Sequence, residues 1–252
     1  MIDPQSMRRT PGIAAGLMAA SLMPAVIAAE PLAAPEDATA WKSSAAVGVT
    51  LTSGNSDTLM VNGSLLTGKK WDQNELAFGA NFTYGEDSDE VNASSAGGFG
   101  QYNRLFTERL YGFLRLDALH DDIAKVDYRV SLSPGVGYYL LKDDKFTLAV
   151  EAGPGYVFER LDGHEQDYLT LRFGERFTWK INERARLWQM FDYQPRAEEW
   201  SDYVLNAEIG IETDITKSLS LRVAAMDTYR SVPAAGREEN DFKLIAGVAY
   251  KF

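Results

Sequence analysis

The chain has 252 residues, no Cys and only two His, and it carries a formal net charge of −11. The lack of Cys excludes disulfides, thiolate nucleophiles and Cys-ligated metals, and two His leave little for zinc or catalytic-triad chemistry. Nucleic acid is not an expected partner, because so acidic a chain has no basic stripe to displace the counterions of phosphate.

The N-terminus has the features of an export signal. Two Arg residues form a cationic start, residues 12–27 form an apolar run, and small residues follow at Ala28 and Ala29. This order of segments predicts a signal peptide over residues 1–29. The apolar run is shorter than the roughly 20 residues that a spanning helix needs. Residues 30–40 are predicted to be a short disordered lead-in.

Beyond the lead-in, extended runs alternate with polar breaks. We predict about 12 strands of roughly 10–14 residues, longer than the 5–6 residues typical of soluble strands and long enough to cross a bilayer with tilt. The sequence thus predicts an all-β fold, a transmembrane antiparallel up-and-down β-barrel over residues 41–252. The predicted strands are 41–53, 58–71, 75–85, 92–105, 109–120, 127–141, 146–159, 167–181, 185–195, 202–215, 219–230 and 241–252.

The breaks between the predicted strands alternate in length. Short ones such as Asn182-Glu183 alternate with mostly longer, more acidic ones such as residues 160–166. Short inner turns and longer outer loops are typical of outer-membrane barrels. An even number of strands then brings both ends of the barrel to the side of the short turns.

The last twelve residues alternate most strictly. Phe242, Leu244 and Val248 fall on one face, and Lys243 and Lys251 fall on the other, because successive side chains of a strand point to opposite faces. A closing strand that ends in an aromatic residue is typical of outer-membrane barrels. We therefore expect the barrel-assembly machinery to be a partner through this strand.

Charged residues recur on the strand faces opposite the Leu, Ile and Phe rows. If these faces look inward, acidic and basic side chains pair there, as buried charges require. Glu175 departs from this pattern, because it falls on the apolar face of its strand, and a register shift or a β-bulge is expected there. The predicted lumen charge network consists of Arg115, Asp117, Arg129, Glu151, Glu159, Arg172, Arg176, Glu208, Glu212 and Arg222.

Aromatic residues gather near both ends of the predicted strands. Amphipathic rings sort to the two membrane interfaces, so membrane lipid and lipopolysaccharide are expected partners. The predicted interface girdle consists of Trp41, Trp71, Trp179, Trp188, Tyr84, Tyr128, Tyr168, Tyr203 and Phe252.

The first predicted hairpin carries a family resemblance. Residues 47–53 (VGVTLTS) lead into Gly54-Asn55-Ser56-Asp57, and the chain closes on Tyr250-Lys251-Phe252. With the acidic barrel, these features resemble the YdiY-like salt-induced outer membrane protein family over about residues 41–252. That family is a domain of unknown function. The resemblance implies the barrel fold and the outer membrane, and no catalytic residues.

These observations favour a non-enzymatic protein of the bacterial outer membrane, either a narrow pore or a stress-responsive structural component with a charged lumen. No catalytic residue, cofactor or metal ligand is predicted, and the oligomeric state stays open. One alternative is a lipid or peptide hydrolase at the outer rim, for which His120-Asp121-Asp122 is the only candidate. The other is a soluble exported β-barrel that binds a ligand inside.

Overall fold

The computed structural model describes residues 40–52, 59–87 and 90–252. The predicted signal peptide, the lead-in up to residue 39 and the Gly54-Asn55-Ser56-Asp57 turn lie outside these residues. No helix in the described part of the chain is long and apolar enough to cross a membrane.

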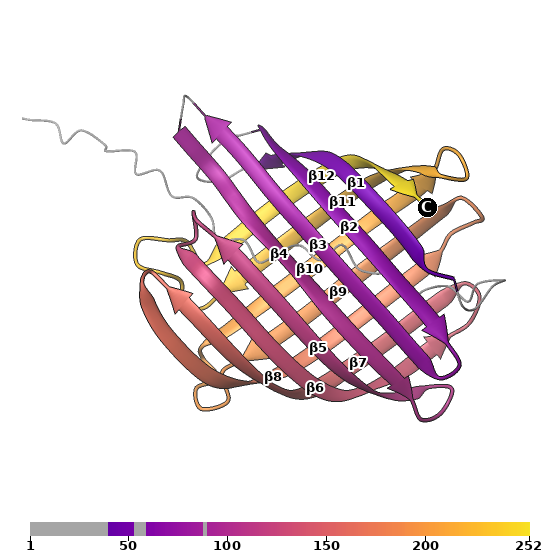
Figure 1. Ribbon diagram of the computed structural model, residues 1–252, viewed down its shortest axis with the longest axis horizontal. Coiled ribbons are helices and arrows are strands. Elements are labelled where there is room, and N and C mark those ends of the chain that lie inside the picture. Colours follow the sequence, from indigo (N-terminus) through magenta and orange to yellow (C-terminus); the bar gives the residue numbers. More distant parts are fainter. Residues whose placement is uncertain (1–39, 53–58, 88–89) are drawn as a thin grey trace, which may run out of the picture.

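Twelve strands run through the described residues and form one closed barrel (Figure 1). Each strand pairs antiparallel with its sequence neighbours, and β1 pairs with β12 to close the cylinder. The predicted up-and-down barrel is confirmed. The strands are β1 (Lys42–Thr52), β2 (Leu59–Trp71), β3 (Asn74–Asp87), β4 (Glu90–Leu105), β5 (Leu110–Asp121), β6 (Val126–Lys142), β7 (Phe146–Leu161), β8 (His164–Lys180), β9 (Ala185–Pro195), β10 (Tyr203–Asp214), β11 (Leu219–Arg230) and β12 (Asn240–Lys251).

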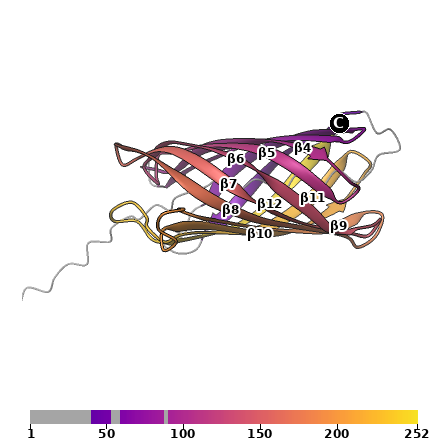
Figure 2. The same cartoon turned by 90° about the horizontal axis from the view of Figure 1, so that it is seen from below.

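The strands are tilted to the long axis of the barrel, and the hairpin turns gather at its two ends (Figure 1). A view turned by 90° shows a flatter profile (Figure 2). We call the end with Phe252 and the β2–β3 turn the short-turn end, and the opposite end the far end. The last residue belongs to the barrel wall, because Ser43 and Phe252 exchange two backbone hydrogen bonds of 3.1 and 3.0 Å.

The turn between β7 and β8 is much shorter than the sequence predicts. The expected loop over residues 160–166 shrinks to Asp162-Gly163, because the two strands pair as far as Leu161 and His164. Both turn residues have positive φ, 50° and 78°. An Asp-Gly pair is the standard sequence of such a two-residue hairpin turn, and it allows the two strands to pair up to the turn itself.

The outer face of the barrel is apolar on every side. Alternate residues of each strand point outward, and many of them are large hydrophobic side chains with 40–65% of their surface exposed. A soluble protein rarely shows an apolar surface of this extent, which suits contact with lipid chains. Exposed members of this belt include Val47, Val61, Leu65, Phe82, Leu114, Leu116, Leu132, Val136, Phe158, Leu169, Ile209, Ile211, Leu221, Leu244 and Val248.

Candidate functional site: the charged lumen

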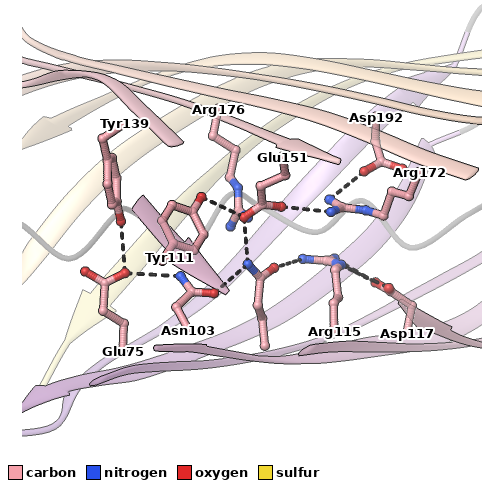
Figure 3. Close-up of polar contacts among 11 residues, drawn as sticks. Glu75, Asn103, Tyr111, Arg115, Asp117, Tyr139, Glu151, Arg172, Arg176 and Asp192 are labelled. Carbon is pink, nitrogen blue, oxygen red and sulfur yellow. Dashed lines mark hydrogen bonds and ion pairs between the residues drawn. The ribbon is translucent and has the colours of Figure 1, made fainter. Parts of the chain in front are cut away.

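Glu151 on β7 is the centre of a polar network that crosses the lumen (Figure 3). Its carboxylate is 4% exposed and accepts hydrogen bonds from Gln101 at 2.8 Å, from the Tyr111 hydroxyl at 2.9 Å and from Arg172 at 2.8 Å. Arg176 also pairs with it. Because β5 and β6 lie between β4 and β7 in the sheet, the contact with Gln101 reaches from one wall to the other. We call these five residues the Glu151 hub.

Two further carboxylates balance the Arg residues around the hub. Arg115 Nη1 donates to Gln101 Oε1 at 3.0 Å, and its Nε and Nη2 bind the carboxylate of Asp117 at 2.6–3.0 Å. Arg172 Nη2 lies 2.6 Å from Asp192 on β9. Each guanidinium therefore faces at least one carboxylate, which is what makes burial of these charges tolerable.

The network continues toward the short-turn end through Glu75 on β3. Glu75 Oε2 accepts hydrogen bonds from Tyr139 at 2.9 Å and from Asn103 at 3.1 Å, and Lys70 pairs with its other oxygen at 3.1 Å. The rings of Tyr111 and Tyr139 pack with centroids 5.1 Å apart. Side chains of β3 to β8 meet in this part of the lumen (Figure 3).

Glycine makes room for the hub. Gly137 faces the lumen on β6, and a Cβ there would lie 2.2 Å from the ring of Tyr111. The missing side chain thus seats the Tyr111 ring against the backbone of β6. The Tyr111 hydroxyl can then reach Glu151 on the strand beyond.

A second cluster surrounds Glu212 on β10. Its carboxylate is 1% exposed and pairs with Arg222, with Arg186 at 3.1 Å and with Lys251 at 2.7 Å. Lys251 also pairs with Asp214. Three cations therefore share two carboxylates near the short-turn end of the lumen.

A third cluster lies toward the far end. Glu159 pairs with Arg129 at 2.6 Å and with Arg230 at 3.5 Å, and it accepts a hydrogen bond of 2.7 Å from Gln166. The Tyr168 hydroxyl lies 3.1 Å from Arg129 and 3.3 Å from Glu159. The lumen clusters hold comparable numbers of acidic and basic groups, although the chain as a whole is strongly acidic.

The structure places all ten residues of the predicted network on the inner strand faces. It joins them in separate groups: Arg115, Asp117, Glu151, Arg172 and Arg176 belong to or adjoin the hub, Arg129 pairs with Glu159, Arg222 pairs with Glu212, and Glu208 binds Trp188. Sequence reasoning missed Glu75, Gln101, Tyr111, Tyr139 and Asp192. Strand parity could have found Asp192, whereas the cross-lumen partners depend on tertiary placement.

Two members of the predicted girdle were wrong. Trp188 is 5% exposed and donates from Nε1 to Glu208 at 2.6 Å inside the lumen. Its ring covers Gly210, where a Cβ would lie 2.1 Å away. Tyr168 also points inward, because it shares the strand face of Arg172. Both residues were placed at the membrane interface because they lie near strand ends. The face of the strand on which a side chain lies determines whether it points to the interface or into the lumen.

The other girdle residues lie on the outer face. Trp41 stacks on Phe78 with ring centroids 6.5 Å apart, and Tyr203 stacks on Tyr229 at 5.7 Å. Trp71 shares its strand face with the exposed Val61. Exposed outer aromatics are Trp41, Tyr84, Tyr128, Trp179 and Phe252.

The expected register shift or bulge at Glu175 was wrong. The pairing of β8 with β7 and β9 continues without a break through this residue. Glu175 points outward among apolar side chains, and Gln189 on β9 donates to its carboxylate at 3.1 Å. A single amide thus satisfies a carboxylate on the lipid-facing surface.

Two cavities lie in the lumen beside the Glu151 hub, and Arg172 and Arg176 of the hub line the first of them. The first is lined from β5, β6 and β8 to β12, with Arg115, Arg129, Glu208 and Lys243 among its residues. The second lies between β1 to β3 and β9, β11 and β12. Its walls on β1 and β2 consist largely of small residues, including Ala46, Gly48 and Ser64.

The candidate His120 at the rim pairs with a carboxylate rather than with a hydroxyl group in the described residues. Ser94 Oγ donates to Asp122 Oδ2 at 2.8 Å, and His120 Nε2 lies 3.2 Å from Asp122 Oδ1. A Ser nucleophile needs the His beside it as base, whereas here both side chains pair with Asp122. Within the described residues, no group of three or more His, Asp or Glu is arranged to hold a metal ion.

The family model described as "Protein of unknown function, DUF481" matches residues 45–252, the whole barrel except its first few residues. The chain belongs to the DUF481 family. The description of this family supplies no activity. The comparison of this DUF481 protein with curated proteins found no match.

Solved structures similar to this DUF481 protein include outer-membrane channels. The NanC porin aligns with a TM-score of 0.57 and 10% identity, over 82% of this chain and 100% of the porin. The COG4313 outer-membrane channel from Pseudomonas putida F1 aligns with a TM-score of 0.52 and 9% identity, over 86% of this chain and 99% of the channel. At these identities the likeness establishes the channel-type barrel fold alone.

Proposed function

We propose that the protein is a narrow channel for small hydrophilic solutes in the bacterial outer membrane. The observation that carries this proposal is the division of the lumen. Polar side chains of β3 to β8 meet in the Glu151 hub and its neighbours, while two cavities with polar and small side chains lie beside them, one lined from β5, β6 and β8 to β12 and one lined from β1 to β3, β9, β11 and β12. A barrel built only as a structural component has no need of a charge-balanced interior with empty space beside it.

The apolar belt and the likeness to outer-membrane channels support the location. With the far end outward and the short-turn end at the periplasm, the protein has the orientation usual for such barrels. Membrane fractionation tests this part of the proposal. Recovery of the protein in the detergent-soluble outer-membrane fraction, with heat-modifiable gel mobility, is the expected result. A protein that stays dissolved in plain buffer would instead be a soluble ligand-binding barrel.

Conductance in planar bilayers tests the channel itself. Wild-type protein should give small single-channel steps. Tyr111→Ala should enlarge them, because it removes a ring from the Glu151 hub inside the lumen. The matched control is Tyr102→Ala, which removes the same ring from the outer face and should leave the conductance unchanged. Silence of the wild type and of both folded variants would contradict the channel and favour a structural envelope component.

The salt-induced character that the family resemblance implies is a further part of this proposal. Salt screens buried ion pairs less than exposed ones. The ion pairs in the lumen should therefore weaken less than surface ion pairs when the ionic strength rises. Expression and outer-membrane abundance, measured in cells grown at low and high salt, test the stress response separately from conduction.

A further inference from the structure

We propose that Lys243 and Arg222 form an anion-binding subsite inside the lumen, suited to a small organic carboxylate. The inference deepens the proposed channel function, because it assigns a solute class to the cavities described above. Lys243 lies on the inner face of β12 and lines both cavities, so it stands where the two spaces meet.

The first argument is the spare hydrogen-bonding capacity of Lys243. The residue is 4% exposed, and its Nζ makes no hydrogen bond to any described residue. Its ion-pair partner is Asp241, two residues away on the same strand, at the long distance of 3.4 Å. A buried ammonium has three donors to satisfy, and leaving them unused costs free energy. A ligand oxygen in the adjoining cavity would satisfy them.

Arg222 provides a second donor to the same space. Its Nε binds Glu212 and its Nη2 lies 3.5 Å from Ser44, but its Nη1 has no hydrogen-bond partner within the described residues. Arg222 lines the second cavity together with Lys243. Two buried cationic side chains thus hold unused N–H groups on one cavity, which favours a carboxylate over a neutral solute.

The surroundings fit an organic anion better than a bare ion. The Trp188 ring and the Ile245 side chain supply apolar wall, and Ser64 and Asn81 supply polar groups on the opposite strands. An orienting charge pair within a partly apolar cavity is typical of small-molecule sites. The Glu151 hub, by contrast, already has a carboxylate at each of its guanidinium groups.

Fluorescence quenching tests the subsite without any transport measurement. Iodide, an anionic quencher, is titrated into the detergent-solubilised full chain. The fluorescence of Trp188 is obtained by subtracting the fluorescence of Trp188→Phe from that of the wild type. Acrylamide, a neutral quencher, is the control for access. We expect iodide to quench Trp188 and acetate to protect it. In Lys243→Gln, iodide quenching should weaken roughly tenfold, the equivalent of one charge-assisted hydrogen bond, with acrylamide quenching unchanged. Lys243→Arg should restore it.

Unchanged iodide quenching of Trp188 in folded Lys243→Gln, or no protection by acetate in the wild type, would overturn the subsite. If Lys243→Gln does not fold, Ala224→Glu takes its place, because it adds a carboxylate to the same cavity and should abolish the effect of iodide while keeping Lys243. The two proposals can fail separately. If the barrel does not conduct but iodide quenching of Trp188 depends on Lys243, only the channel is disproved. If the barrel conducts but the quenching does not depend on Lys243, only the subsite is disproved.

Discussion

Glu151 on β7 and Gln101 on β4 join opposite walls of the barrel through a hydrogen bond of 2.8 Å. Two strands of the sheet separate them, so the bond exists only because the barrel is closed and flat enough for side chains to meet across it. Glu151 is also the shared acceptor of two Arg residues. One carboxylate therefore holds the wall-to-wall contact and neutralises the cations beside it.

Glu151→Ala should destabilise the barrel strongly. The change leaves Arg176 without its carboxylate and Arg172 with only Asp192. Breaking a buried ion pair by removing one partner costs about 3–5 kcal/mol. The urea midpoint in detergent micelles measures the loss. Glu165→Ala is the matched control, since Glu165 is an exposed carboxylate on β8 and its loss should change stability by less than about 0.5 kcal/mol. Equal midpoints for the two variants would disprove the hub's role.

Gly210→Val should unseat Trp188. A Cβ at this position would lie 2.1 Å from the indole ring, so the ring must leave its place and lose its hydrogen bond to Glu208. Overpacking of this kind costs about 1–3 kcal/mol. The Trp emission should shift and the urea midpoint should fall. Ala207→Val enlarges a residue on the outer face of the same strand, and it should leave both measurements as in the wild type.

Glu175→Leu should stabilise the protein in lipid vesicles. The carboxylate lies on the apolar outer face, where an acidic group is costly, and we expect a gain of roughly 1 kcal/mol. Gln189→Leu should act in the opposite direction, because it removes the amide that donates to Glu175 and leaves the carboxylate in place. Unfolding in vesicles compares the two variants. If Glu175→Leu destabilises the barrel, the Glu175–Gln189 pair contacts a protein partner rather than lipid chains.

Phe252→Ala should separate folding from assembly. The ring is 66% exposed, and the backbone of Phe252 keeps its two hydrogen bonds to Ser43 in the variant. Folding of purified protein into vesicles should therefore be close to wild type. In cells, the heat-modifiable fraction should fall if the barrel-assembly machinery reads the terminal aromatic residue. Trp41→Ala removes another exposed outer aromatic and should spare assembly. Equal losses in the two variants would contradict a specific role for Phe252.

The sequence by itself determined the number of strands, their order and most of their faces. A strand turns alternate side chains to opposite sides, so rows such as Leu205, Ile209 and Ile211 and the acidic row of Glu208 and Glu212 are legible in the printed chain. The same parity placed the ten charged residues inward. It also placed Glu175 outward, and the structure keeps that position.

Tertiary structure alone decided which inward groups meet. Glu151 and Gln101 are 50 residues apart, and Tyr139 and Glu75 are 64 apart. Such contacts depend on how flat the closed barrel is and on glycines such as Gly137, which lets the Tyr111 ring lie against the backbone of the neighbouring strand. Strand alternation fixes only which way a side chain points. The distance across the lumen is set by the closed barrel as a whole. It determines which charges pair, and it leaves N–H groups of Lys243 and Arg222 without partners beside a cavity.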